Sequence, residues 1–150
     1  MSKIHDIEEA DVSYEEKGAW VYGLVALAGW VTYVLVLLVR ADGAALADSP
    51  YVPTLLWTIG ISAFAPVVGR LLVEVVRPSE THRPDVRDRE IDRRGEYVGG
   101  IVLGVGMVGP FALALLDADS FWIANAMYTA FVVAAVVGSL VKVVAYRRGL

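Results

Sequence analysis

The sequence of 150 residues contains no cysteine and only two histidines, His5 and His82. The lack of cysteine excludes disulfides, thiolate-bound metals and thiol redox chemistry. Because both histidines lie outside the long apolar runs, a haem held by histidines between membrane helices is not expected. We also find no H-x-x-x-H pair, no glycine-rich phosphate loop in a soluble segment, and no Ser/His/Asp set. The sequence therefore predicts no enzyme, no catalytic residue and no cofactor.

Charge is also scarce over four long stretches of the chain, which is 57% hydrophobic. About 20 apolar residues, each rising 1.5 Å, cross the hydrocarbon core of a bilayer, so each stretch predicts a membrane-spanning helix. The expected fold is an all-α integral membrane four-helix bundle. Its predicted spans are about 18–39, 51–76, 97–116 and 121–146, with the charged segment 77–96 between the second and third.

Basic residues are unevenly distributed between the segments that join these spans. Segment 77–96 carries six arginines and residues 147–150 carry two, whereas the loops 40–50 and 117–120 together carry one. The positive-inside rule then predicts a multi-pass protein of the cell (inner or plasma) membrane, with both termini in the cytoplasm. The N-terminal segment 1–17 is acidic, and acidic residues weigh little in that rule. The excess of Arg over Lys, 10 to 3, is typical of a GC-rich prokaryote.

A faint internal repeat suggests that the bundle consists of two tandem helical hairpins. "KGAWVYGLV" at 17–25 aligns with "RGEYVGGIV" at 94–102. The alternative is a chance match between spans rich in Val, Ala and Gly. Small residues also recur at four-residue spacing, which lets helix backbones approach closely. Such faces favour seams within the bundle or, alternatively, a homo-oligomer contact; they include Gly95, Gly99, Ala130, Ala134 and Gly138.

Three charged residues lie inside predicted spans, namely Arg70, Glu74 and Lys142. Charged groups within a span are expensive and mark either ion pairs or pathways. Arg70 and Glu74 are spaced i,i+4, which favours an ion pair on one helix face. Because all three lie near the inner ends of their spans, we expect a structural ion-pair network there. The alternative is an inner vestibule of a small transporter or channel.

Segment 83–100, "RPDVRDREIDRRGEYVGG", is the densest charge run of the chain. A helix that begins near Asp85 and continues into the third span places four acids within an arc of about 80°, at 100° per residue. This acidic stripe consists of Asp85, Asp88, Asp92 and Glu96, with the bases Arg87, Arg89, Arg93 and Arg94 opposite or beside it. We expect the stripe to face cations such as Lys142 or Arg147 at the inner ends of the helices.

The alternative ligands for this charge run are a divalent cation, nucleic acid and anionic lipid headgroups. One straight helix rarely converges enough oxygens for a divalent cation, so no metal site is predicted. Residues 83–96 hold five acids and five bases, which disfavours nucleic acid. Anionic lipid headgroups at the arginines are compatible with the structural role.

The stretch "DVRDREIDRRGEYVG", residues 85–99, resembles a D-x-R-D-x-x-I-x-x-x-[GA] signature that precedes the third span in a family of uncharacterised small prokaryotic four-span membrane proteins. The matching positions are Asp85, Arg87, Asp88 and Ile91. This resemblance implies the four-span fold and a membrane location, and it implies no activity. The expected function is a non-enzymatic membrane protein, surrounded by lipid, whose face formed by residues 85–96 assembles the bundle and docks a cytoplasmic protein partner.

Overall fold

The computed structural model describes residues 14–76 and 86–148, including the side chains of 16–65, 67–68 and 86–148. These residues form helices joined by short turns, and no strand occurs among them. The elements are α1 (Tyr14–Ala41), the short 3-10 helix η1 (Leu46–Asp48), α2 (Tyr51–Val76), α3 (Val86–Gly106), α4 (Val108–Leu115) and α5 (Ser120–Arg148).

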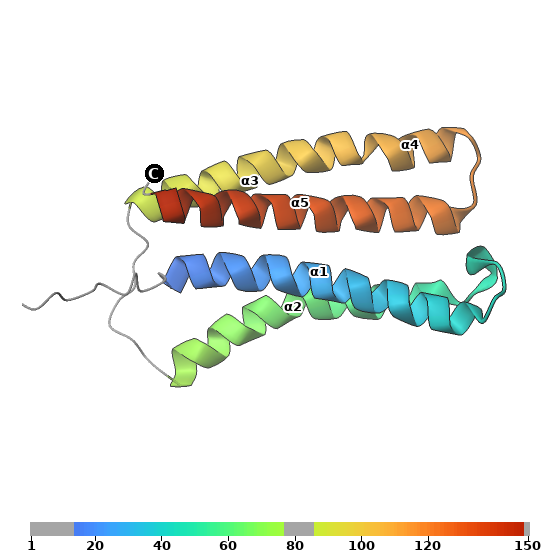
Figure 1. Ribbon diagram of the computed structural model, residues 1–150, viewed down its shortest axis with the longest axis horizontal. Coiled ribbons are helices and arrows are strands. Elements are labelled where there is room, and N and C mark those ends of the chain that lie inside the picture. Colours follow the sequence, from blue (N-terminus) through green and yellow to red (C-terminus); the bar gives the residue numbers. More distant parts are fainter. Residues whose placement is uncertain (1–13, 77–85, 149–150) are drawn as a thin grey trace, which may run out of the picture.

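The helices form two antiparallel hairpins, as Figure 1 shows. In the first, α1 and α2 are joined through η1; in the second, α3 and α4 run as one rod and return through a tight turn into α5. The first residues of α1 and α3 and the last of α2 and α5 therefore lie at one end of the molecule. We call this the charged end, and we call the opposite end, with η1 and the turn at 116–119, the loop end.

The hairpins pack in the order α2, α1, α5 and then α3/α4. Among the described residues, α1 and α5 hold the middle positions, α2 packs chiefly on α1, and α3 and α4 pack chiefly on α5. Figure 1 shows α2 diverging from α1 toward the charged end. The predicted four-helix packing is thus a row of neighbours rather than a ring in which every helix meets two others.

Three helices are long and apolar enough to cross a membrane: Glu16–Ala41, Val86–Leu115 and Ser120–Arg148. Their mean hydropathies over 18 residues are 2.1, 2.1 and 2.0. Only 17%, 11% and 39% of those windows are buried inside the protein, so most of their apolar side chains face outward. In α2 the apolar stretch Tyr51–Ala65 is shorter, so three of the four predicted spans reach this length within the described residues.

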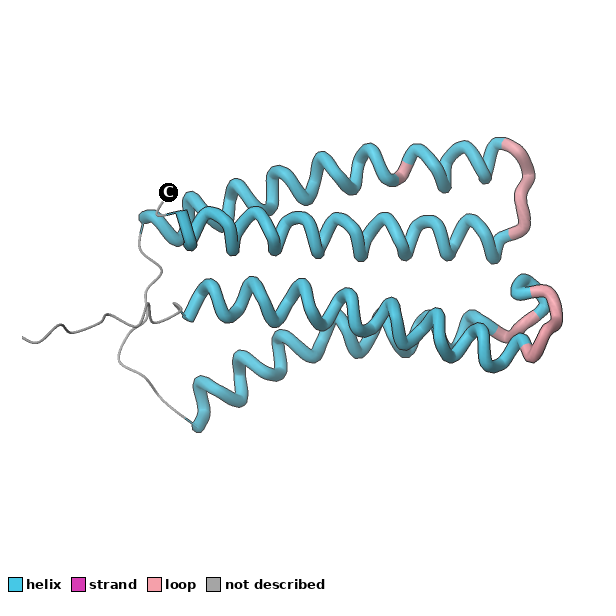
Figure 2. The backbone as a smooth tube through the Cα atoms, viewed as in Figure 1, coloured by secondary structure: helices cyan, strands magenta, loops and turns pink. Residues whose placement is uncertain are grey.

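The third predicted span, 97–116, is not one uninterrupted helix. Helix α3 ends at Gly106, and α4 begins at Val108, with Met107 as a turn residue between them (Figure 2). A proline inside a helix is expected to kink or break it, and here the break lies three residues before Pro110. Pro110 has no N–H to donate to the carbonyl of Gly106, and its ring crowds that carbonyl. Helix α2, by contrast, remains helical through Pro66.

Small residues bring α3 and α5 together along a seam within the chain. A Cβ added to Gly99 would lie 3.2 Å from the carbonyl oxygen of Ala134, and one added to Gly138 would lie 3.0 Å from that of Gly95. At these points the helix backbones touch directly, which side chains larger than glycine prevent. Gly100, by contrast, has no neighbour within 4 Å of its added Cβ and is not part of the seam.

The main core lies toward the loop end, where α1, α2 and α5 meet. Its buried members are Tyr33, Leu37, Leu55, Phe121, Tyr128 and Val132. Aromatic rings meet edge to face here, with Tyr51 and Phe121 centroids 4.9 Å apart. The N-terminus of helix α5 is capped at this core, because Asp119 Oδ1 accepts a hydrogen bond from the Phe121 amide at 2.7 Å. The charged end therefore has to be held by other contacts.

Candidate functional site

Helix α3 begins in the charge run and continues without interruption into apolar sequence. Its first turns are supported by pairs at helical spacing, because Glu90 accepts from Arg94 Nε at 3.2 Å and lies 3.3 Å from Arg93 Nη2. The side chains of Arg93 and Arg94 are 79% and 55% exposed. We call Glu90, Arg93 and Arg94 the outward charge triplet, since they form the exposed side of this part of α3.

The opposite side of the same turns packs on α5. Ile91 is only 2% exposed and Gly95 is buried, so these two residues are the centre of the contact. The described members of the acidic stripe, Asp88, Asp92 and Glu96, therefore lie along the edge of the α3–α5 contact rather than in its centre. Asp88 is half-buried at this edge, whereas Glu96 is exposed.

Helix α5 supplies the cation and the hydroxyl that meet the stripe. Lys142 Nζ lies 2.7 Å from Asp92 Oδ1, and the lysine side chain is 21% exposed. One turn further along α5, the Tyr146 hydroxyl donates to Asp88 Oδ1 at 3.3 Å. Two residues of the expected stripe thus contact α5, and the ion pair of Lys142 is formed with Asp92.

A third contact links α1 to the same part of α5. Arg147 Nε donates to Glu16 Oε1 at 3.2 Å, and the guanidinium lies 5.8 Å from the ring centre of Trp20. The Glu16 side chain is only 9% exposed, so Arg147 compensates a largely buried carboxylate. No pattern in the sequence predicted this role for Glu16. Lys142, Tyr146 and Arg147 together form what we call the α5 hub, which holds both α1 and α3 at the charged end.

The other predicted site residues are either exposed on α3 or lie outside the described part of the structure. Arg87 and Arg89 are exposed on α3. Arg70 and Glu74 belong to α2, but their side chains are outside the described part of the structure, as is all of Asp85. Within residues 14–76 and 86–148, acidic and histidine side chains do not gather in the groups of three or more that could hold a metal ion.

A second polar cluster lies inside the core at the loop end, and its two tyrosines are functional candidates that the sequence-based prediction did not include. Tyr33 of α1 and Tyr128 of α5 meet edge to face with ring centroids 5.6 Å apart. They are 1% and 6% exposed. Both hydroxyls are buried and lack a hydrogen-bond partner among the described residues. With Ser62 of α2 and Asn125 of α5 they form what we call the polar junction.

Hydrogen bonds beside the polar junction follow one face of α5. Asn125 Nδ2 donates to the Phe121 carbonyl at 2.8 Å, and Thr129 donates to the Asn125 carbonyl at 2.8 Å. Trp30 Nε1 of α1 then donates to Thr129 Oγ1 at 3.1 Å. A signal for this cluster did exist in the sequence, because tyrosines normally lie at the membrane interfaces and these two lie well inside their spans.

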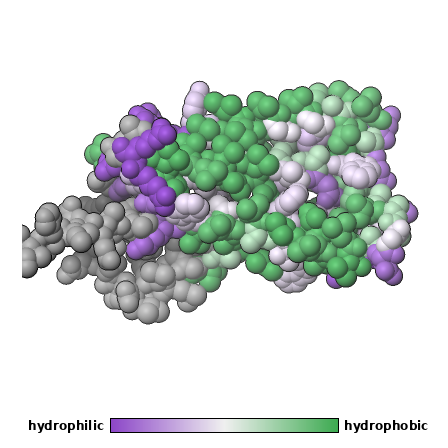
Figure 3. All heavy atoms as spheres, viewed as in Figure 1, coloured by the Kyte–Doolittle hydropathy of each residue, from purple (hydrophilic) through white to green (hydrophobic). Residues whose placement is uncertain are grey.

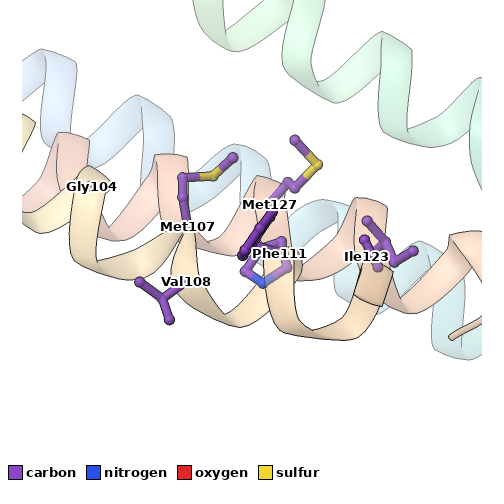
Figure 4. Close-up of a pocket in the computed structure, with 8 residues that line it drawn as sticks. Gly104, Met107, Val108, Phe111, Ile123 and Met127 are labelled. Atoms are coloured by element: carbon purple, nitrogen blue, oxygen red, sulfur yellow. The ribbon is translucent and has the colours of Figure 1, made fainter. Parts of the chain in front are cut away.

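Two shallow grooves flank the rod of α4 where it meets α5. One, of about 480 Å³, is apolar and is lined by Met107, Phe111 and Met127 among others; Figure 4 shows Met107 on α3/α4 and Met127 on α5 at its edge. The other, of about 530 Å³, includes Asn125 and Thr129 in its lining. Lys142 lines neither of these grooves, so neither of them is the inner vestibule that was the alternative to an ion-pair network.

Comparison with protein-family models, with curated proteins and with solved structures gave no match for this chain, so its resemblance to the four-span family stays a prediction.

Proposed function

We propose that this chain is a non-enzymatic multi-pass protein of the cell membrane, with both termini in the cytoplasm, whose charged end fastens the helices together and docks a cytoplasmic protein partner. The proposal rests mainly on the observation that the two sides of the charged turns of α3 have different surroundings. One side of its charged turns meets α5 through Asp88 and Asp92, and the other side presents the outward charge triplet to the surroundings.

The fastening role is supported by the position of the α5 hub. The main core holds α1, α2 and α5 near the loop end. Near the charged end, helix contacts include the Asp92–Lys142 pair, the Tyr146–Asp88 hydrogen bond and the Arg147–Glu16 pair. Partly exposed pairs of this kind contribute about 0.5–1 kcal/mol each, so they help to align helix ends without dominating the stability.

The docking role is supported by the exposure of the outward charge triplet. Arg93 and Arg94 share the carboxylate of Glu90, so one acid is matched by two bases on this face. Exposed arginines that are only partly neutralised bind carboxylates of a partner with directional, often bidentate hydrogen bonds. We therefore expect a protein partner with an acidic contact surface.

The test compares two variants in the full chain, purified from the membrane. We expect Arg93→Glu with Arg94→Glu to abolish co-purification of the partner and to leave the melting temperature nearly unchanged, because both side chains are exposed. We expect Asp92→Ala to lower the melting temperature modestly, because it leaves Lys142 without its carboxylate. The same variant should retain the partner, because Asp92 is not part of the outward charge triplet. Retention of the partner by the charge-reversed variant would refute the docking role.

A small transporter or channel is the alternative function. The observation in its favour is the polar junction, which places hydroxyl and amide groups within otherwise apolar helices. The inner vestibule at Arg70, Glu74 and Lys142 has weaker support, because Lys142 is occupied by Asp92 at 2.7 Å. Solute uptake into liposomes that contain the purified protein, lost on Asn125→Leu and retained in the outward-triplet variant, would favour transport over docking.

A further inference from the structure

The polar junction brings together hydroxyl-bearing side chains from three helices, namely Tyr33 of α1, Ser62 of α2 and Tyr128 of α5. Gly29 of α1 makes room for them, because a Cβ at this position would collide with Ser62 Oγ and would lie 3.8 Å from the Tyr128 hydroxyl. One turn along the same face of α1 is Tyr33, whose ring contacts that of Tyr128. The junction lies about 12 Å from the loop end, counting eight residues from Tyr33 to Ala41 at 1.5 Å each.

The two tyrosine hydroxyls are buried without a described partner. A buried hydroxyl that makes no hydrogen bond loses its solvation and recovers nothing, and a surrounding bilayer supplies no partner either. Asn125 precedes Tyr128 by three residues on α5, and its Nδ2 is used by the Phe121 carbonyl. The junction therefore holds two buried hydroxyls whose hydrogen-bonding capacity is unused among the described residues.

The chemistry of these groups defines what can occupy the junction. The junction is built from hydroxyls and one amide, all of them neutral, so an ion would find no counter-charge in these groups. The rings of Tyr33 and Tyr128 pack edge to face, with centroids 5.6 Å apart. A guest that both donates and accepts hydrogen bonds, has no charge and occupies little volume is a water molecule, which typically makes about three hydrogen bonds at buried sites.

We propose that the polar junction binds ordered water, which bridges the hydroxyls of Tyr33 and Tyr128 to Ser62 and Asn125 and so joins α1, α2 and α5 inside the apolar part of the protein. Asn125 and Thr129 also line the groove of about 530 Å³ beside α4. Figure 3 shows hydrophilic atoms within the recess between the two hairpins, surrounded by apolar surface.

The first experiment is a double-mutant cycle on the full chain in nanodiscs. Tyr33→Phe and Tyr128→Phe each remove a hydroxyl and keep the ring contact. We expect each variant to lower the melting temperature, and the double variant to lower it by less than the sum of the two, because both hydroxyls share the same water. The matched control is Tyr97→Phe, whose side chain is exposed and which should change nothing and show no coupling.

The sign of the effect separates the proposal from the simpler alternatives. If the hydroxyls are unsolvated, phenylalanine leaves the melting temperature unchanged or raises it. If Tyr33 bonds only to Asn125, its variant is destabilised without coupling to Tyr128. Either result overturns the proposal.

The second experiment detects the water directly. Solid-state NMR with magnetisation transfer from water should show rapid transfer to the ring signals of Tyr33 and Tyr128, comparable with that of exposed Tyr97. In the Tyr33→Phe, Tyr128→Phe double variant we expect transfer to these two rings to be lost. Slow transfer to both rings in the unaltered protein would refute a water site.

Discussion

At the scale of single residues, α3 and α5 approach each other through backbone atoms at two glycines. Gly95 and Gly138 face each other across the α3–α5 seam, and a Cβ at either position would approach the carbonyl oxygen of the other within 3.0 Å. A backbone carbonyl cannot move aside as a flexible side chain does. The two helices are therefore held at a separation that only glycine permits.

We expect Gly138→Ala to destabilise the protein by about 1–3 kcal/mol, the usual cost of overpacking, because α3 and α5 must separate. The matched control is Gly100→Ala, since Gly100 lies on the same helix as Gly95 and has open space around it. Thermal unfolding in one detergent checks both variants. Equal stability of the two would contradict the seam.

Some contacts at this scale could be predicted from spacing alone. Glu90 and Arg94 are four apart on one helix, and the acidic stripe was expected to meet Lys142, which lies beside Asp92. The central role of Ile91 could not be predicted, because a single apolar residue in a charge run gives no periodicity. The meeting of Tyr33 with Tyr128 at the polar junction could not be predicted, because the members of the junction come from three helices whose relative rotation is set by tertiary packing.

At the scale of elements, the rod formed by α3 and α4 is interrupted where a proline removes one hydrogen bond. Met107 still donates to the Leu103 carbonyl at 2.9 Å, and Phe111 donates to Met107 at 3.1 Å. The helix is thus broken over a single residue and resumes at once. Both grooves beside α4 include Pro110 in their lining, so the break and the grooves occur together.

We expect Pro110→Ala to restore a continuous helix across Met107 and to narrow the grooves. Spin labels at Gly100→Cys and Leu115→Cys measure this directly, because the chain has no cysteine of its own. The distribution of distances between the two labels should become narrower, around the separation expected for a straight helix, about 22 Å between the two backbones. Pro53→Ala is the control, because Pro53 lies in the first turn of α2, where its missing N–H costs nothing.

Helix positions were largely predictable from the sequence, and helix neighbours were not. The expected spans 18–39 and 121–146 lie inside α1 and α5, and span 51–76 coincides with α2. Uncharged length and capping residues determine these bounds locally. The order α2, α1, α5, α3/α4 depends instead on which small residues meet, and small residues recur on several helices.

At the scale of the whole molecule, polar and apolar surface are segregated along the long axis. Figure 3 shows hydrophilic residues gathered at the charged end and the loop end, with an apolar band between them. Large side chains within this band are strongly exposed, for example Trp57 at 72% and Val105 at 69%. Apolar exposure of this extent is unusual for a soluble monomer and suits a protein surrounded by hydrocarbon.

The orientation across the membrane can be measured with reporter fusions. We expect fusions after residues 80 and 150 to report the cytoplasm, because these positions adjoin the basic charged end. Fusions after residues 45 and 118 should report the opposite side, where the connecting loops carry one basic residue between them. An external signal at residue 80 would overturn the proposed orientation and the docking role together.

The middle position of α5 has a consequence for the order of assembly. Its neighbours α1, α3 and α4 all precede it along the chain, so they leave the ribosome first. Until α5 arrives, the glycine face of α3 and the Glu16 carboxylate of α1 cannot make their contacts with Gly138 and Arg147. The two hairpins are therefore joined late, and we expect the arrival of α5 to be the step that brings them together.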